Sequence, residues 1–311
     1  MKRILVVKLS SLGDLFHALP AVNLIQRHTG AEVDWVCHRM YLDLVAAFVP
    51  VSRAIAYPRH SFVRDASAFF AALRKEEYDL ALDFQGLLKS AMVIRAARAA
   101  RRIGPSFSRE GSHIFYDAVS GPTNKKRHAV EECLDTARFL GLPDAPVEFP
   151  VKFPKISLDL PHPRIGLLPC SRRTEKNWPI ERFAEVARAL GPKAQASFVV
   201  LGGPADAEAC AALTELIGES AQNWCGRTSI LELGGLLRDL DLLITVDSGP
   251  MHLAAAVGIP TVAIFGPTDP IKTGPYGKQQ RVVRDGLNLN DQCAAPVIDA
   301  ALELLEAGKS R

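Results

Sequence analysis

The chain has 311 residues, of which 48% are hydrophobic and 23% are charged, a composition typical of a globular protein with enough length for two domains. No apolar run is long enough to cross a bilayer, and the basic start Met1-Lys2-Arg3 leads into a short strand instead of a signal peptide, so we expect a cytoplasmic protein. The formal net charge of +3 is too small for a nucleic-acid-binding protein, and no recognised nucleic-acid-binding motif is present.

The first half of the chain begins with a strand at 3–9, a tight turn at 10–14 and a helix at about 15–28. The turn lacks the G-x-G-x-x-G pattern, so it does not predict dinucleotide binding. Asp14 stands near the helix start, where the helix dipole and free N–H groups keep a carboxylate ionised. Locally, Asp14 is equally well explained as charge complementation of the helix or as a functional carboxylate.

The alternation of strands and helices then continues to residue 140. The long polar and basic connection at 105–127 has no predicted element, and loops of this length in compact α/β domains are usually functional or mobile. The sequence predicts strands at 32–37, 54–57, 80–83 and 102–104, and helices at 41–48, 66–77, 91–100 and 128–140.

Positive charge is concentrated in this half of the chain. Residues 1–150 contain 20 Lys and Arg against 16 Asp and Glu, whereas the remainder contains 17 against 18. A basic face of this kind suits an anionic partner, and for any single residue a solvated helix face explains the charge equally well. The concentration comprises Arg95, Arg98, Arg101, Arg102, Arg109, Lys125, Lys126 and Arg127.

A proline-rich stretch from Pro143 to Pro163, with six prolines, predicts an interdomain linker with little helix. We therefore expect an N-terminal domain at 1–155 and a C-terminal domain at 156–295. We expect a closing helix at 296–311, for which packing back on the N-terminal domain is one possible arrangement. The second half repeats the alternation, with strands at 164–168, 196–201, near 224, 242–246 and 261–265, and helices at 180–190, 206–217, 229–239, 251–257 and 297–307.

The stretch 241–270 combines a buried strand, a small-residue turn, a helix start and a second strand. The turn supplies an N-cap residue and a proline at the helix start, and such a helix N-terminus presents N–H groups and a positive dipole end to an anion. Ser248, Gly249 and His252 surround this point. A well-capped structural helix is the alternative, but a second loop at 266–270 follows the neighbouring strand, where open parallel sheets bind ligands.

Six cysteines are scattered along the chain with no C-x-x-C pair and no histidine at metal-ligand spacing. We therefore expect reduced, mostly structural cysteines and no metal site. They are Cys37, Cys133, Cys170, Cys210, Cys225 and Cys293.

Seven sequence pieces, taken together, resemble the bacterial ADP-heptose:lipopolysaccharide heptosyltransferases of glycosyltransferase family 9, with the heptosyltransferase I branch the nearest. They occur in order across both halves of the chain, and it is their combination that makes the resemblance specific. The pieces are VKLSSLGDLFHALPA at 7–21, DFQGLLKSA at 83–91, RHAVE at 127–131, EKNWP at 175–179, LGGPADAE at 201–208, VDSGPMHLAAA at 246–256, and FGPTDP with GPYGK at 265–278.

The resemblance implies an α/β protein of the GT-B type, in which two Rossmann-like domains face each other across a cleft. It implies an inverting, metal-independent transfer of L-glycero-D-manno-heptose from ADP-heptose to a Kdo sugar of the lipid A inner core. Asp14 matches the general base proposed for the family, which takes a proton from the acceptor hydroxyl. Lys176 and the helix start at Ser248-Gly249 suit the stabilisation of charge on the departing diphosphate.

The remaining site residues are also implied by the resemblance. The donor side comprises Ser171, Asp206, Asp247, Ser248, Gly249, His252 and Thr268. Asp206 replaces a glutamate of the family, and Arg172 beside Ser171 departs from the family pattern. The acceptor side comprises Ser11, Gly13, Arg64, Gln85, Lys89, Arg127 and His128.

The implied partners are an ADP-heptose donor, a Kdo-lipid A acceptor and, transiently, the inner face of the cytoplasmic membrane, with no cofactor and no nucleic acid. Two other interpretations stay open at this point. One is heptosyltransferase II or another relative that uses a different sugar or acceptor. The other is a non-catalytic nucleotide- or glycan-binding module on the same scaffold, against which the presence of both Asp14 and Lys176 argues.

Overall fold

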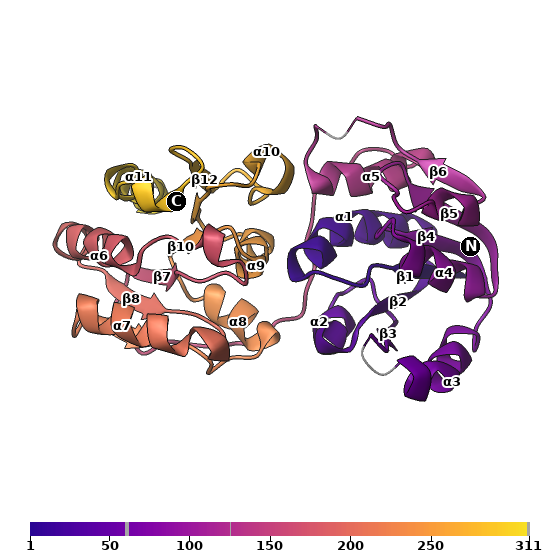
Figure 1. Ribbon diagram of the computed structural model, residues 1–311, viewed down its shortest axis with the longest axis horizontal. Helices are drawn as coiled ribbons and strands as arrows, with labels where there is room; N and C mark the ends of the chain where they lie inside the picture. Colours follow the sequence, from indigo (N-terminus) through magenta and orange to yellow (C-terminus); the bar gives the residue numbers. More distant parts are fainter. Residues whose placement is uncertain (60–61, 125, 310–311) are drawn as a thin grey trace. The chain divides into compact units, whose positions relative to one another are not determined.

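A computed structural model describes residues 1–59, 62–124 and 126–309, so that Lys125 of the basic concentration lies outside the described residues. The chain divides into two compact units, Met1–Lys152 and Phe153–Arg311 (Figure 1). The division falls inside the proline-rich stretch, just before the expected boundary at 155. Within the described residues, none of the helices combines the length and apolarity that a membrane crossing requires.

The first unit is built on a six-stranded parallel sheet in the order β3-β2-β1-β4-β5-β6. The central strand β1 has the sequence RILVV and is buried on both faces, as expected for a parallel strand covered by helices. The strands are β1 (Arg3–Val7), β2 (Glu32–His38), β3 (Arg53–Tyr57), β4 (Tyr78–Asp83), β5 (Ala99–Pro105) and β6 (Ala118–Ser120).

Helices cover both faces of this sheet. One core cluster joins Leu5 and Val7 of β1 to the apolar sides of α3 and α4, while α1 and α5 pack side by side (Figure 1). The helices are α1 (Leu12–Thr29), α2 (Leu42–Ala46), α3 (Phe62–Leu73), α4 (Leu88–Ala96) and α5 (Ala129–Phe139), with single turns η1 (Arg39–Tyr41) and η2 (Ser112–Phe115).

The second unit contains a six-stranded parallel sheet in the order β12-β11-β10-β7-β8-β9. Counted within the unit, this order is the same as in the first, so each unit has the doubly wound topology of a Rossmann fold. The strands are β7 (Arg164–Leu168), β8 (Ser197–Val200), β9 (Ala221–Asn223), β10 (Leu242–Val246), β11 (Thr261–Ile264) and β12 (Gln280–Val283).

The main core of the second unit lies between its sheet and three helices, α6, α7 and α11. On the other side of the sheet α8 and α9 contact each other (Figure 1). The helices are α6 (Ile180–Ala194), α7 (Ala207–Ile217), α8 (Ile230–Leu237), α9 (Gly249–Val257), α10 (Pro270–Thr273) and α11 (Ala295–Lys309), with single turns η3 (Thr174–Lys176), η4 (Pro204–Asp206) and η5 (Leu289–Asp291).

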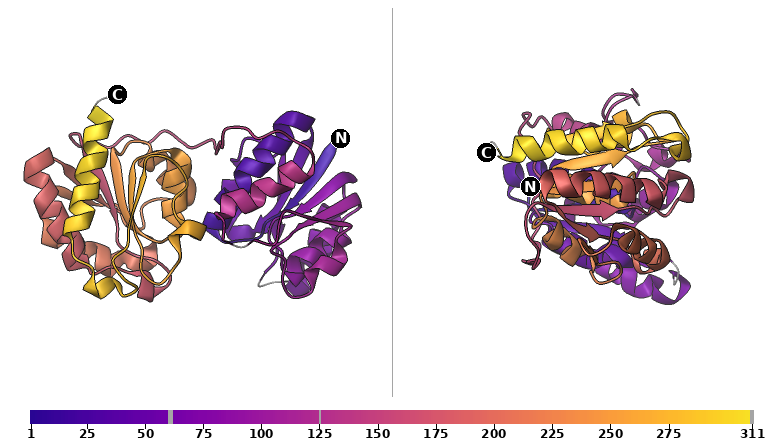
Figure 2. Two further views of the ribbon diagram at one scale, coloured as in Figure 1. Left: turned by 90° about the horizontal axis from the view of Figure 1, so that it is seen from above. Right: turned by 90° about the vertical axis from the view of Figure 1, so that its left-hand side faces the viewer.

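The closing helix α11 belongs to the second unit. Val297, Ala301 and Leu304 enter its core, and the helix lies beside α6 in both views of the unit (Figure 2). Helix α11 is therefore part of the second unit, because its apolar side is buried against the sheet of that unit.

Three short elements were missing from the sequence prediction: β6, β12 and α10. Strand β6 has only three residues and lies in the predicted loop 105–127, and β12 is an edge strand with the sequence QRVV. Neither of these two strands contains enough residues to show the alternation of apolar and polar side chains that predicts a strand. Their conformation is decided by pairing, of β6 with β5 and of β12 with β11.

The start of the second unit is anchored by two glycines of α8. A Cβ on Gly234 would lie 2.3 Å from the Phe153 ring, and a Cβ on Gly235 would lie 2.2 Å from the Pro154 carbonyl oxygen. Residues 153 and 154 therefore pack directly on the helix backbone, which explains why the unit begins at Phe153.

We expect Gly235→Ala to lower the free energy of unfolding by about 1–3 kcal/mol, because the neighbouring atom is backbone and cannot rotate away. This loss exceeds the gain of up to about 1 kcal/mol that alanine normally brings inside a helix. Urea denaturation measures the difference. Gly308→Ala in α11 is the matched control, since a Cβ there meets no atom within 4 Å. Equal stability of Gly235→Ala and the native chain would contradict the packing.

Candidate active site

In each sheet the strand order reverses beside the first strand of the unit, between β1 and β4 and between β7 and β10. Open parallel sheets bind ligands outside the carboxyl ends of the strands at this switch point. Asp14 and Gln85 follow β1 and β4, whereas Lys176 and Asp247 follow β7 and β10. Within each unit, these predicted residues therefore lie at the carboxyl edge of the sheet, where the topology places a site.

A buried ion pair spans the switch point of the second sheet. The Lys176 ammonium donates to Asp247 Oδ2 at 2.6 Å, and the Thr268 hydroxyl donates to the same oxygen at 2.6 Å. The exposed side-chain fractions are only 15% for Lys176 and 7% for Asp247. These residues come from the loops after β7, β10 and β11, and the structure brings them together as one cluster.

Helix α9 begins directly beside this cluster. Ser248 is its extended N-cap residue and Gly249 its first helical residue, followed by Pro250 in the first turn. The N-terminal N–H groups of this nine-residue helix and its dipole suit an anion. His252 lies in the first turn of the same helix and is partly buried.

Ser171 and Asp206 are each held by local hydrogen bonds. The Ser171 N–H donates to Asn177 Oδ1 at 2.8 Å, which fixes the loop after β7 that carries Lys176. Asp206 Oδ2 accepts the Gly203 N–H at 2.8 Å and shapes the turn after β8. Asn177 was quoted within a motif but not predicted as a site residue. Its contact with Ser171 lies within the irregular loop after β7, where no regular period predicts which side chains meet.

In the first unit, Asp14 forms the capping box of α1. Its Oδ2 accepts hydrogen bonds from the Ser11 N–H at 2.6 Å and from the Ser11 hydroxyl at 2.9 Å. The Asp14 side chain is 41% exposed, and Gly13 beside it is buried in the first helical turn. The carboxylate is thus a helix cap that stays accessible to solvent, which is compatible with either local explanation of Asp14.

Two histidines adjoin Asp14. His17 Nδ1 lies 3.9 Å from Asp14 Oδ1, and the His17 ring meets the His128 ring edge-on at 5.7 Å. His128 is the N-cap of α5, where its Nδ1 accepts the Val130 N–H at 3.1 Å. The structure therefore brings Asp14 and His128 together through His17, which sequence reasoning missed. The available signal was a histidine three residues after Asp14 inside an apolar helix pattern.

Gln85 ties the ends of β1 and β4 together. Its Oε1 accepts the N–H groups of Leu9 at 3.1 Å and Ser10 at 3.2 Å, which holds the turn that leads to Asp14. Beneath it, the buried Lys8 donates from Nζ to the Phe84 carbonyl oxygen at 2.7 Å. Lys8 was also missed, although a lysine inside an otherwise apolar strand was a visible signal.

Asp83 organises the loop that presents Gln85. This fully buried carboxylate accepts the Gln85 N–H at 2.7 Å, the Gly86 N–H at 3.1 Å and the Tyr116 hydroxyl at 2.7 Å. Burial raises the pKa of Asp83, although these hydrogen bonds oppose the rise. The role of Asp83 is thus to fix the backbone that carries the predicted site residue.

The three remaining acceptor-side cations differ in their surroundings. Arg127 forms a two-pronged ion pair with the buried Asp135, which raises the pKa of the guanidinium and ties the β6–α5 loop to α5. Arg64 is exposed on α3 and pairs with the adjacent Asp65. Lys89 is partly buried in the first turn of α4. Of the three, the structure gives Arg127 a clear structural role.

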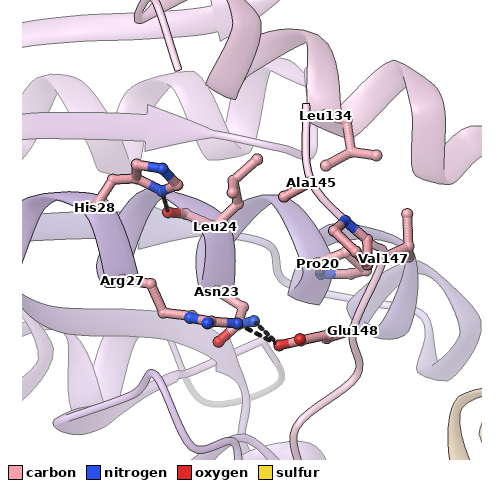
Figure 3. A pocket seen from close by; sticks show the side chains of 10 residues that line it. Pro20, Asn23, Leu24, Arg27, His28, Leu134, Ala145, Val147 and Glu148 are labelled. Carbon is pink, nitrogen blue, oxygen red and sulfur yellow. Dashed lines mark hydrogen bonds and ion pairs between the residues drawn. The ribbon is translucent and has the colours of Figure 1, made fainter. Parts of the chain in front are cut away.

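A pocket of about 460 Å³ lies along the other half of α1, between this helix and the chain at 145–148 (Figure 3). Arg27 and Asn23 both donate to Glu148 there, at 2.7 and 3.3 Å. The α1 residues that line the pocket are Pro20, Asn23, Leu24, Arg27 and His28, all C-terminal to Asp14 on this helix. It therefore does not belong to the carboxyl edge of the sheet.

The comparisons with known proteins agree on one family. The model of glycosyltransferase family 9 (heptosyltransferase) matches residues 66–296, which is more than half of the chain. The lipopolysaccharide core heptosyltransferase OpsX of Haemophilus influenzae is 26% identical, over 91% of this chain and 84% of its own. Lipopolysaccharide heptosyltransferase 1 of Escherichia coli K12 is 29% identical, over 93% of this chain and 97% of its own.

Solved structures show the same similarity in three dimensions. The E. coli heptosyltransferase WaaC with ADP has a TM-score of 0.85 and 27% identity, over 97% of this chain and 99% of that chain. The same enzyme with ADP-2-deoxy-2-fluoro heptose has a TM-score of 0.82 with the same coverage. The expected GT-B class of fold is thereby confirmed.

Proposed function

Because the chain belongs to glycosyltransferase family 9, the heptosyltransferases, we propose that it transfers L-glycero-D-manno-heptose from ADP-heptose to a Kdo sugar of the lipid A inner core, with inversion at the anomeric carbon and without a metal ion. The observation that carries this proposal is the cluster of Lys176, Asp247 and Thr268 beside the start of α9. It supports a site for a nucleoside diphosphate group at the switch point of the second sheet.

The proposed reaction is a single displacement. The acceptor hydroxyl attacks the anomeric carbon of the heptose as the bond to the diphosphate oxygen breaks. Asp14 takes the hydroxyl proton, since its carboxylate is partly exposed and already held in position by Ser11. An attack opposite to the departing group inverts the configuration at that carbon.

The departing diphosphate gains negative charge, and the second unit supplies the charge that stabilises it. An ammonium has three N–H donors, so the single bond from Lys176 to Asp247 leaves donors for a phosphate oxygen. The N–H groups at the start of α9 act on the same group. Asp247 and Thr268 keep Lys176 in place before the donor binds, which reduces reorganisation during the reaction.

ADP is expected to stabilise the protein against thermal unfolding, by about 2.7 kcal/mol at a concentration 100-fold above its Kd. UDP and GDP at the same concentration are the controls and are expected to shift Tm less. Transfer from ADP-heptose to Kdo-lipid A, followed by mass spectrometry of the product, then tests the acceptor. If heptose were transferred only to an acceptor that already carries heptose, the chain would have a heptosyltransferase II activity instead. If UDP alone stabilised the protein, ADP-heptose would not be its donor.

We further propose that the first unit contacts the membrane surface that holds the lipid acceptor. Helix α4 and the turn η2 touch each other and present three exposed apolar side chains, Leu88, Met92 and Ile114, with exposed fractions of 39%, 58% and 72%. Leu88 and Met92 are four residues apart and share one side of α4. Exposed side chains of this size, contributed by neighbouring segments, are typical of an interaction surface.

The charges around this apolar patch favour an anionic lipid surface as its partner. Arg95 on α4 and Arg109 before η2 are exposed, and Lys89 lies beside Leu88. Glu110 is the acidic neighbour, and its carboxylate accepts the Leu88 N–H at 3.0 Å. Apolar side chains flanked by Lys and Arg suit insertion between acyl chains beneath anionic headgroups.

The double variant Met92→Glu/Ile114→Glu is expected to bind at least about tenfold more weakly to vesicles of phosphatidylglycerol and phosphatidylethanolamine, because each large apolar side chain contributes about 1.5 kcal/mol on burial. Co-sedimentation measures the bound fraction. Leu216→Glu on α7 is the control, since Leu216 is also an exposed apolar side chain but lies in the second unit. Equal vesicle binding by all three proteins would rule this surface out.

A further inference from the structure

A buried histidine lies between the proposed general base and the acceptor side of the first unit. His17 follows Asp14 by three residues on α1 and is only 5% exposed. Its Nδ1 atom lies 3.9 Å from Asp14 Oδ1, and its ring meets the His128 ring edge-on, with the ring centroids 5.7 Å apart. His17 therefore borders both the residue that takes the proton in our proposal and a residue proposed to hold the acceptor.

The two oxygens of the Asp14 carboxylate have different surroundings. Oδ2 accepts both the N–H and the hydroxyl of Ser11, at 2.6 and 2.9 Å, whereas Oδ1 is the oxygen close to His17. The two bonds use the lone pairs of Oδ2, so Oδ1 is the oxygen better suited to take a proton from the acceptor hydroxyl. At 3.9 Å the His17 nitrogen is too distant for a hydrogen bond to Oδ1, but it restricts where Oδ1 can lie.

The His128 ring is restrained from two sides. As the N-cap residue of α5, His128 accepts the Val130 N–H on Nδ1 at 3.1 Å. A neutral ring that accepts on Nδ1 carries its proton on Nε2, which is a donor suited to a carboxylate or phosphate oxygen of the acceptor. The edge-on contact with His17 is the second restraint, and it limits the tilt of the ring.

The neighbouring buried polar groups have other roles. Lys8 donates from Nζ to the Phe84 carbonyl oxygen at 2.7 Å, so it supports the end of β4. Cys133 on α5 is a buried thiol, and burial raises its pKa to about 12. Because this thiol is uncharged at neutral pH, it cannot act on Asp14 as an ion. His17 is thus the side chain that joins Asp14 to His128.

We propose that His17 is a positioning residue for heptosyl transfer. Its Nδ1 side keeps Asp14 Oδ1 directed at the acceptor hydroxyl, and its ring edge keeps His128 in the orientation that holds the acceptor. The proposal rests on the proposed function and adds no new chemical step. The proton still passes from the acceptor hydroxyl to Asp14, and His17 determines how accurately the two groups meet.

Two substitutions separate the two contacts, because each preserves one of them. His17→Phe keeps a ring against His128 and loses the nitrogen beside Asp14, so kcat should fall about tenfold while the acceptor KM changes by less than about twofold. His17→Gln keeps a polar nitrogen beside Asp14 and loses the ring, so the acceptor KM should rise about three- to tenfold while kcat changes less. Steady-state kinetics with varied Kdo-lipid A at saturating ADP-heptose measure both constants.

Phe16→Leu is the control for a loss of packing. Phe16 is the buried neighbour of His17 on α1, and its ring packs against Phe48 instead. This variant should lower Tm and leave both kinetic constants unchanged. If the two His17 variants lost kcat and acceptor affinity together, in proportion to their loss of Tm, His17 would be a core residue only. Native kinetic constants in both His17 variants would also overturn the proposal.

A measurement that needs no transfer separates this proposal from the proposed function. In histidine ring NMR of the full chain, Asp14→Asn should shift the signals of His17 and His128. The signal of His28, which contacts the Leu24 carbonyl oxygen further along α1, should stay unchanged. Unshifted His17 and His128 signals would overturn the coupling even in a chain that transfers heptose. Absence of transfer by the native chain would overturn the proposed function, and the ring signals would still decide whether His17 couples Asp14 to His128.

Discussion

Asp14→Asn is expected to reduce the rate of heptosyl transfer by about 10²–10⁴-fold, the usual contribution of a general base. Asparagine keeps an oxygen that can accept the Ser11 N–H, so the capping geometry of α1 survives while the proton acceptor is lost. Since the donor is held by the other unit in our proposal, ADP should still raise Tm to the native extent. Steady-state kinetics with both substrates, together with the ADP thermal shift, measure these effects.

A matched control separates the chemistry of Asp14 from its capping role. Glu232 makes the same kind of capping box at the start of α8, where it accepts the Ser229 N–H at 2.8 Å, and it has no proposed role in transfer. Glu232→Gln should therefore leave the transfer rate unchanged. If Asp14→Asn transferred heptose at the native rate, or lost activity only as much as Glu232→Gln, Asp14 would be a helix cap and nothing more.

Lys176→Ala is expected to lower the transfer rate by about 10²–10³-fold, because its charge matters most as the diphosphate leaves. It should lower kcat more than it affects the KM of the acceptor. The variant should also lose stability on the order of 3 kcal/mol, since Asp247 is buried and, among the residues that the structure describes, its carboxylate would keep the Thr268 hydroxyl but lose its cationic partner. Urea denaturation and steady-state kinetics report the two losses separately.

The double variant Lys176→Ala/Asp247→Asn distinguishes loss of charge from loss of folding. It removes both charges, so most of the stability should return while transfer stays slow. Arg164→Met is the control, because it breaks a comparable ion pair with Asp239 in the same unit, away from the switch-point cluster. Arg164→Met should be destabilised and active. Recovery of transfer by the double variant, or a change only in acceptor KM, would contradict the role of Lys176.

Long, strongly patterned segments could be predicted from the sequence because their conformation depends on neighbours in the chain. The apolar run at 242–246 forms β10 with unchanged bounds, and Ser248 and Gly249 begin α9 as their capping chemistry indicates. Asp14 likewise lies at the start of α1. The motif residues also follow the carboxyl ends of strands within each unit, since in a parallel sheet all strands end at the same edge.

Tertiary structure alone decided which of these side chains meet. Lys176 pairs with Asp247, 71 residues further along the chain, and Arg127 pairs with Asp135. The sulfurs of Cys210 and Cys225 both lie beside Gly202, although the chain has no cysteine motif. The sequence by itself determined two units of alternating strands and helices and the strand ends that carry their polar residues, because turns, caps and apolar periods are local. Contacts between different strand ends depend on the order of strands in the sheet, which is set by packing across the whole unit and leaves no local pattern.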